Sequence, residues 1–223
     1  MTQTAVITGA SQGLGAALAR GLSGAGWNLV IDARTEKDLE AVAASLNNVV
    51  AIAGDVVDDD HRAELAAAAD KLGGADLLVN NASTLGGSPP PALGDFPLPA
   101  LLGTFEVNVL APIALTQLVL PQLRQSRRGA VLNISSDAAV EAYEGWGGYG
   151  AAKAALDHAS RVLAKEEPEL RVWSVDPGDL RTRLQQEAFP GEDISDRPLP
   201  ETVVPWFLKL LDERPESGRY VAR

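Results

Sequence analysis

The sequence contains no cysteine and only two histidines, and these shortages remove several kinds of chemistry at once. Without cysteine there is no disulfide, no thiol nucleophile and no thiolate metal site. His61 follows the acidic run 58–60, which indicates the solvated start of a helix. His158 falls in an apolar-rich helical run, where a packed or surface histidine is more common than a metal ligand. We therefore predict that the protein has no metal site.

Positive charge is also scarce, because 19 Lys and Arg residues stand against 30 Asp and Glu residues, for a net charge of −11. Such a surface repels nucleic acid and anionic membranes, so we expect neither as a partner. No basic leader precedes the first strand-like run, and no apolar stretch is expected to reach the roughly 18 residues that cross a bilayer. These absences predict a cytoplasmic protein.

Short β-rich runs alternate along the chain with longer, alanine-rich amphipathic runs. The predicted strands are 4–8, 28–33, 49–53, 77–80, 130–135, 171–175 and 219–221. The predicted helices are 14–25, 36–46, 60–72, 101–125, 150–165 and 201–211. This alternation predicts an α/β fold with a doubly wound parallel sheet of about seven strands and helices on both faces. We expect a single domain over residues 1–223.

Two long segments interrupt the alternation. Segment 84–99 is rich in glycine and proline, and segment 183–200 is polar and bounded by prolines. Loops of this length in a compact domain are usually functional, although a tolerated surface insertion is the alternative for each. We predict that 183–200 is a substrate lid, with Phe189 able to close over the substrate.

A glycine-rich turn follows the first predicted strand and opens a helix. It consists of Thr8, Gly9, Ala10, Ser11, Gln12, Gly13, Leu14 and Gly15. Glycines allow the backbone to turn tightly and approach a pyrophosphate, and the helix N-terminus offers free N–H groups. The turn therefore predicts a nucleotide phosphate site.

Tyr149 and Lys153 stand four positions apart in a helical run, so both lie on one face of the helix. An ammonium group beside a phenol lowers the pKa of the phenol. A tyrosine of this kind can exchange a proton with a carbonyl or an alcohol near neutral pH. The pair predicts an acid/base centre.

The glycine spacing resembles that of the short-chain dehydrogenase/reductase family, and the resemblance extends over nearly the whole chain. It is carried by the glycine turn together with Asn80-Asn81-Ala82, Asn108, Ser136, Tyr149, Lys153 and Pro177-Gly178. Ser83 departs from the pattern, because the family usually has glycine there. The resemblance implies a Rossmann-type fold and a nicotinamide cofactor. It also implies catalytic roles for Tyr149 as acid/base, Lys153 as its partner, Ser136 as the ligand of the substrate oxygen and Asn108 as the holder of a water.

The same resemblance implies where the cofactor lies. The implied cofactor residues are Thr8, Gly9, Ser11, Gln12, Gly13, Leu14, Gly15, Arg34, Asp55, Val56, Asn81, Ala82, Tyr149, Lys153, Pro177, Gly178, Leu180 and Thr182. Arg34 stands at the end of the second strand, where an arginine favours the 2′-phosphate of NADP(H). Gln12 argues the other way, since NADP-dependent relatives often carry a basic residue in the turn. We expect NADP(H) rather than NAD(H).

The function implied is hydride transfer between this cofactor and a small carbonyl or secondary alcohol. The alternative is a sensor or regulator that binds the cofactor on the same fold without turnover. Tyr143 and Trp146 could form an aromatic pocket wall and Glu141 or Glu144 could select a polar group, or all of them could be ordinary core and surface residues. The resemblance also implies a homodimer or homotetramer built through the helical runs 101–125 and 150–165.

Overall fold

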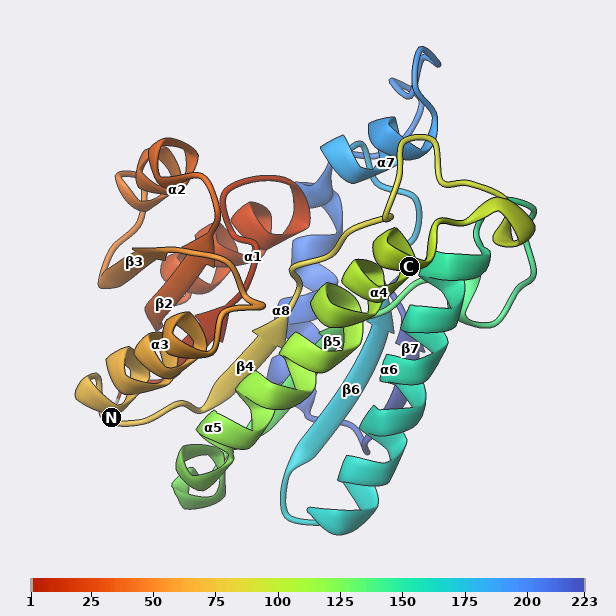
Figure 1. Ribbon diagram of the computed structural model, residues 1–223. Coiled ribbons are helices and arrows are strands. Elements are labelled where there is room, and N and C mark those ends of the chain that lie inside the picture. Colours follow the sequence, from red (N-terminus) through yellow and green to blue (C-terminus); the bar gives the residue numbers. More distant parts are fainter. Residues whose placement is uncertain (1, 223) are drawn as a thin grey trace.

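The computed structural model describes residues 2–222, which form one seven-stranded parallel sheet in the order β3-β2-β1-β4-β5-β6-β7 (Figure 1). The strands are β1 (Thr4–Ile7), β2 (Asn28–Ala33), β3 (Val49–Ala53), β4 (Leu77–Asn80), β5 (Ala130–Ile134), β6 (Arg171–Asp176) and β7 (Gly218–Val221). The chain starts at β1 in the middle, winds outward to β3, and then returns to build the other half from β4 to β7. The prediction of a doubly wound parallel sheet of about seven strands is confirmed.

Helices cover both faces of the sheet. They are α1 (Gly13–Gly24), α2 (Glu36–Ala43), α3 (Asp59–Lys71), α4 (Leu98–Phe105), α5 (Ala111–Gln125), α6 (Gly147–Glu166), α7 (Arg183–Ala188) and α8 (Val204–Glu213). Successive strand residues point to opposite faces, so Ile7 joins the core under α1 and α8 while Val6 joins the core under α3 and α5. Both faces of the central strands are buried, as the continuous apolar runs require.

The long helical run 101–125 begins earlier than predicted and is interrupted. Helix α4 passes through a π-helical turn, Glu106–Leu110, before α5 begins. The combined helix, Leu98–Gln125, is long and apolar enough to cross a membrane by length and composition alone. The expectation that no apolar stretch has this length is therefore wrong. Leu115, Val119 and Leu123 are buried in the core against the sheet, and a soluble protein's core helix passes the same test.

The second interruption is more structured than the sequence suggested. Segment 183–200 begins with the short helix α7, whose first turn is capped by Thr182: the Thr182 hydroxyl accepts a hydrogen bond from the backbone N–H of Gln185 at 3.2 Å. Segment 84–99 touches this helix, because the Ser88 hydroxyl donates to the Glu187 carbonyl oxygen at 2.7 Å. The two irregular segments therefore meet above the carboxyl edge of the sheet.

Candidate active site

A cleft with a volume of about 660 Å³ lies where the parallel strands end. Open α/β sheets bind their ligands at this edge, where the strand order reverses. The sequence-predicted residues on its wall are Gly9, Ser11, Gln12, Gly13, Leu14, Arg34, Asp55, Val56, Asn81, Ala82, Ser136, Tyr149, Lys153, Pro177, Gly178, Leu180 and Thr182. Thr8, Gly15 and Asn108 are buried and do not line the wall.

The glycine turn is packed so closely that side chains cannot replace its glycines. A Cβ atom on Gly15 would lie 2.4 Å from the Gly9 carbonyl oxygen, and one on Gly9 would lie 2.9 Å from Ala82 Cα. Gly9 and Gly13 also have φ angles of +67° and +55°. Thr8 fixes the turn to the next strand, because its hydroxyl accepts from the N–H groups of Asn81 and Ala82, both at 3.0 Å. The backbone of the turn can therefore approach a bound phosphate closely.

A buried ion pair supports the glycine turn from below. One carboxylate oxygen of Asp32 accepts from the Gly9 N–H at 2.7 Å, and the other lies 3.0 Å from His61 Nε2. Asp32 and His61 are 1% and 7% exposed, so the prediction of a solvated His61 is wrong. The acidic run 58–60 does start the helix, since Asp58 caps α3. His61, the residue after the run, turns inward toward β2. The hydrogen bond to Asp32 raises the pKa of His61, while burial raises the pKa of Asp32.

Because both oxygens of Asp32 are occupied, this side chain has little left to offer a ribose. Arg34, two residues later, is exposed and lines the cleft. Asp55 and Val56, after β3, line the same end, and the Asp55 carboxylate accepts from the Val57 N–H at 3.1 Å. Asp38, at the start of α2, lines this end as well, so it offers the Arg34 guanidinium, the carboxylates of Asp38 and Asp55, and the apolar side chain of Val56.

Helix α6 carries the acid/base pair on its buried face. Lys153 Nζ lies 5.5 Å from the centre of the Tyr149 ring, and both side chains are buried. The Lys153 ammonium donates to the Ile134 carbonyl oxygen at 2.8 Å, which ties α6 to the end of β5. Burial lowers the pKa of Lys153 to about 8, with Asp157 acting in the opposite direction.

The expected depression of the Tyr149 pKa is not what the surroundings produce. Burial is the largest influence and raises the pKa of the phenol, and Asp176 and Asp137 raise it further. Hydrogen bonding to Ser83 and Ser136 acts in the opposite direction. The spacing on the helix placed the ammonium near the ring correctly, but it did not reveal how completely both groups leave water.

Ser136 and its neighbour Ser135 have separate environments. The Ser136 hydroxyl donates to the Asp137 carboxylate at 3.0 Å, and its side chain lines the cleft. Ser135 is 2% exposed, and its hydroxyl has no hydrogen-bond partner within residues 2–222. Of the two, Ser136 is the one whose hydroxyl lies near the Tyr149 phenol.

Asn108 is fully buried in the π-helical turn between α4 and α5. Such turns push a side chain out of helical register and are common at functional sites. The Asn108 amide oxygen accepts from the Thr84 N–H at 2.9 Å and the Ser83 hydroxyl at 3.2 Å, and its nitrogen donates to the Thr84 carbonyl oxygen at 2.8 Å. Ser83, the departure from the family pattern, therefore lies between Asn108 and Tyr149.

The segment after β6 forms the remaining wall. The Asp176 carboxylate accepts from the Gly178 N–H at 2.9 Å, which holds the Pro177–Gly178 turn at the end of the strand. Leu180 is buried, and Thr182 packs near Gly13 across the cleft. The glycine turn and this segment therefore face each other.

Aromatic side chains close the cleft beside Tyr149. The Trp146 ring lies 5.6 Å from the Tyr149 ring and 6.0 Å from the Phe189 ring, measured between centroids. Tyr143 is 47% exposed and donates to Asp137 at 3.0 Å. Tyr143 and Trp146 line the cleft, whereas Glu141 and Glu144 are exposed and lie off its wall.

Two contacts of this site, made by Arg219 and His61, were not predicted from the sequence. Arg219, on β7, hydrogen-bonds the Ser136 carbonyl oxygen, and His61 pairs with Asp32. Each contact joins residues far apart in the chain, so predicting it requires knowing how the strands pair and which residues lie side by side. Within residues 2–222, no three His, Asp or Glu side chains are grouped in a way that could hold a metal ion.

Known proteins that resemble this chain are short-chain dehydrogenases and other oxidoreductases. The short chain dehydrogenase family model matches residues 3–193. An uncharacterised oxidoreductase of Mycobacterium tuberculosis is 37% identical over 199 residues, covering 86% of this chain and 74% of its own. Rat sepiapterin reductase is 36% identical over 199 residues, and the match covers 82% of this chain and 76% of the reductase.

A solved structure of a short-chain dehydrogenase from Escherichia coli, complexed with NADPH, superposes with a TM-score of 0.90 at 28% identity and covers 99% of this chain and 96% of that chain. Because the family model spans most of the chain and these proteins share its architecture, the chain belongs to the short-chain dehydrogenase/reductase family of oxidoreductases.

Proposed function

We propose that this protein reduces small aldehydes or ketones with NADPH, or oxidises the corresponding alcohols with NADP⁺. The observation that carries the proposal is that the glycine turn, Arg34, Ser136 and the Tyr149–Lys153 pair line one cleft. A sensor has no need for a buried acid/base pair at the far end of its nucleotide site.

The residues fit a nicotinamide dinucleotide. The turn is closed to side chains and open to backbone contact, and the pyrophosphate would lie against Gly13 and Leu14 at the start of α1. The Thr182 hydroxyl accepts from Gln185, so its own proton is free to bond the nicotinamide carboxamide. When bound, the cofactor supplies or accepts a hydride at the reacting carbon.

The chain's own residues would handle the proton. Tyr149 donates its phenolic proton to the carbonyl oxygen as the alcohol forms, and it accepts the proton in the reverse direction. Ser136 bonds the same oxygen and holds it toward Tyr149. Lys153 stabilises the phenolate that remains, which matters because burial otherwise disfavours that charge. Asn108, through Ser83, fixes the segment beside Tyr149.

Arg34 favours NADPH over NADH in this proposal. Its guanidinium is exposed at the end of β2 and has no carboxylate partner within 4.0 Å among residues 2–222. A free guanidinium suits a 2′-phosphate, which it can bond with two parallel N–H groups. The NADPH complex of the Escherichia coli relative supports the same choice.

Segment 183–200 would act as the lid of the substrate pocket. Phe189 packs on Trp146, and Arg197 stacks on Phe189 with its guanidinium carbon 5.4 Å from the ring centre. The Arg181 side chain holds the far part of the segment through the carbonyl oxygens of Ser195 and Arg197. The lid residues on the cleft wall are Arg183, Leu184, Gln185, Glu187 and Phe189, so Leu184 and Phe189 would contact an apolar group of the substrate.

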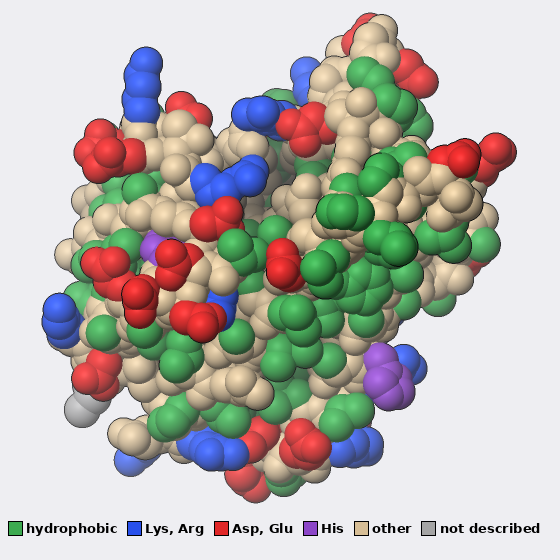
Figure 2. Space-filling model, in the orientation of Figure 1, with side chains coloured by type: hydrophobic (Ala, Val, Ile, Leu, Met, Phe, Trp, Pro, Cys, Tyr) green, Lys and Arg blue, Asp and Glu red, His purple; other side chains and the backbone are tan. Residues whose placement is uncertain are grey.

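An apolar surface over α4 and α5 supports self-association into a dimer or tetramer (Figure 2). Leu98, Leu102 and Leu110 are 76%, 60% and 55% exposed. Isolated exposed leucines are ordinary, but a contiguous patch of this kind is typical of an interface. Sedimentation velocity tests the point, and a monomer at all concentrations would contradict it.

The net charge of −11 suits a cytoplasmic protein.

A panel of small aldehydes and ketones, followed by the loss of NADPH absorbance, tests the catalytic proposal. We expect turnover with at least one member and a preference for NADPH over NADH. Cofactor binding without turnover on any carbonyl or alcohol would favour the sensor, and no cofactor binding would exclude both.

A further inference from the structure

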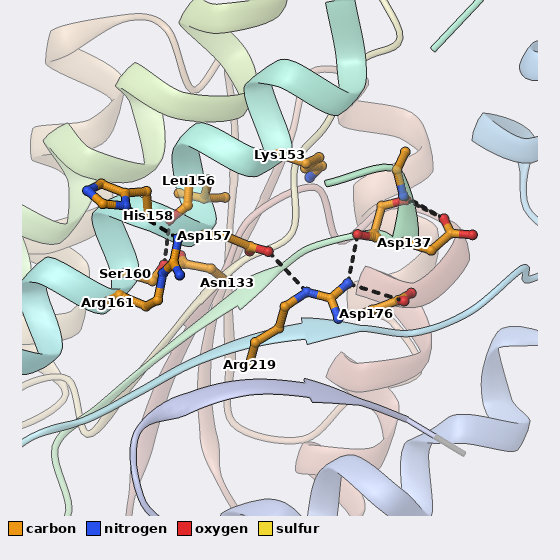
Figure 3. A network of polar contacts seen from close by, with 12 residues as sticks. Asn133, Asp137, Lys153, Leu156, Asp157, His158, Ser160, Arg161, Asp176 and Arg219 are labelled. Atoms are coloured by element: carbon orange, nitrogen blue, oxygen red, sulfur yellow. Dashed lines mark hydrogen bonds and ion pairs between the residues drawn. The ribbon is translucent and has the colours of Figure 1, made fainter. Parts of the chain in front are cut away.

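Arg219 lies on the last strand, β7, outside every motif that marks the cleft. Its side chain is 27% exposed and points from β7 across the end of β6 toward α6 (Figure 3). Arg219 pairs in register with Ser174 of β6, which in turn pairs with Asn133, so β6 alone separates Arg219 from the carboxyl end of β5. This position brings its guanidinium beneath the catalytic end of the cleft.

One guanidinium group joins three segments there. Arg219 Nε donates to the Asp157 carboxylate of α6 at 3.1 Å. Its Nη2 donates to the Ser136 carbonyl oxygen at 2.9 Å and lies 3.5 Å from the Asp176 carboxylate. Figure 3 shows the three contacts radiating from the one side chain. The planar guanidinium presents its donors in a fixed fork, so the three segments are held in one relative geometry.

Each of the three partners is connected to a group that the proposed reaction uses. Ser136 bonds the substrate oxygen. Asp157 stands one helical turn after Lys153 on the same buried face. Asp176 holds the Gly178 N–H at 2.9 Å and thereby the turn beside the nicotinamide. No other residue within 2–222 joins these three segments through one side chain.

Asp157 depends on this contact. It is 7% exposed, its Oδ2 accepts from Arg219, and its Oδ1 has no hydrogen-bond partner within residues 2–222. A buried carboxylate without a partner is costly, and the cost would fall on the helix that carries Tyr149 and Lys153.

We propose that Arg219 is a positioning residue of the active site, which fixes Ser136, helix α6 and the Pro177–Gly178 turn relative to one another through its guanidinium fork. The proposal rests on the proposed function for the meaning of those three segments. It assigns Arg219 no contact with substrate or cofactor.

We expect the charge of Arg219 to act on the acid/base pair through the two carboxylates that it contacts, Asp157 and Asp176. The charged groups around the pair are Asp157 on α6, Asp176 at the end of β6, Asp137 after β5 and Arg219 on β7. Asp157 raises the pKa of Lys153, and Asp176 raises that of Tyr149. Loss of the guanidinium leaves both carboxylates uncompensated, so the pKa values of Lys153 and Tyr149 should both rise.

Two substitutions separate geometry from charge. Arg219→Lys keeps the positive charge and loses the fork, whereas Arg219→Met loses both. We expect Arg219→Lys to lower kcat about tenfold with its pH profile in place. We expect Arg219→Met to lower kcat about 10- to 100-fold and to move the profile for alcohol oxidation to higher pH. NADPH affinity should change less than about threefold in either variant.

Arg161→Met is the matched control, because Arg161 is an exposed arginine on the same helix α6. All rates are taken well below each variant's melting temperature. An Arg219→Met enzyme with kcat within twofold of the Arg161→Met enzyme would overturn the proposal, even if its melting temperature is lower. If Arg219→Met does not fold, Arg219→Lys carries the same test of kcat.

A readout independent of turnover keeps this test distinct from that of the proposed function. The pKa of Lys153, followed by the ¹³Cε chemical shift in NMR, should rise from about 8 in Arg219→Met and return toward it in the double variant Arg219→Met/Asp157→Asn. An unchanged Lys153 pKa would overturn the charge argument. A pKa that stays raised in the double variant would show general loosening of α6 instead. A wild-type enzyme inactive on every carbonyl would contradict the proposed function alone.

Discussion

The two ends of the cleft stand on different kinds of buried ion pair. Under the phosphate turn, Asp32 is held by His61, whose charge depends on pH. Under the catalytic end, Asp157 and Asp176 are held by Arg219, whose charge does not. Both ends need a carboxylate to anchor a backbone N–H or a helix, and both must neutralise it because burial is expensive.

The difference follows from what each end must do. At the catalytic end, the proposed reaction requires Tyr149 to lose and regain a proton beside Lys153, so a neighbour that also changed its charge near neutral pH would disturb the pair. At the cofactor end, no residue is proposed to transfer a proton, and a histidine suffices. The comparison predicts that changes at the catalytic end alter kcat, and that changes at the cofactor end alter affinity for the cofactor.

The largest effect is expected at the catalytic end. Tyr149→Phe removes the proton donor and should lower kcat by about 10²- to 10⁴-fold, because general acid/base groups contribute on that scale. NADPH binding, measured by fluorescence titration, should persist. Tyr220→Phe is the matched control, since Tyr220 lies on the edge strand β7 and its hydroxyl donates only to the Glu216 carbonyl oxygen just before that strand. Substantial activity in Tyr149→Phe would refute the assignment of Tyr149 as the proton donor.

The phosphate turn gives the next largest effect. Gly15→Ala places a Cβ atom 2.4 Å from the Gly9 carbonyl oxygen and should weaken NADPH binding and cost about 1–3 kcal/mol of unfolding free energy. Gly24→Ala, in the same helix with nothing within 4 Å of the new atom, is the control and should stabilise slightly. Calorimetric titration and thermal unfolding measure both. Equal behaviour of the two variants would mean that the turn tolerates displacement.

Arg34→Ala tests the cofactor end through charge rather than shape. Loss of a charge-assisted bond worth about 1.5–3 kcal/mol should raise the Kd for NADPH about 10- to 100-fold and leave the Kd for NADH nearly unchanged. Lys37→Ala removes the same charge from the neighbouring exposed position and should affect neither. Equal losses for NADPH and NADH in Arg34→Ala would refute a 2′-phosphate contact.

The smallest effect is expected from the Asp32–His61 pair beneath the phosphate turn. The Asp32 carboxylate raises the pKa of His61, so its stabilisation is complete below the unfolded value of about 6.5 and is lost as pH rises through the raised folded value. His61→Gln should therefore cost on the order of 1 kcal/mol at pH 6 and less at pH 8. Exposed His158→Gln should show no such trend. Urea unfolding at both pH values measures it, and a pH-independent loss would mean that only the hydrogen bond matters.

Much of this molecule could be read from the chain in advance, for local reasons. The strands were placed to within about a residue, because each is a short apolar run bounded by turn residues. The glycine turn and the Tyr149–Lys153 spacing were visible because their geometry is set within a few neighbouring residues. Helix α7 was missed, since six residues with a single Thr182 cap are too short to give a periodic signal.

The sequence by itself determined the alternation of strands and helices, the closed glycine turn and the placing of Tyr149 and Lys153 on one helix face. Those are properties of neighbours in the chain, which bond angles and helix geometry fix. Only the tertiary structure decided that His61 turns inward to Asp32, that burial raises rather than lowers the pKa of Tyr149, and that Arg219 reaches Ser136. Burial and register depend on which distant segments pack together, and desolvation acts on a group only after the rest of the fold has closed over it.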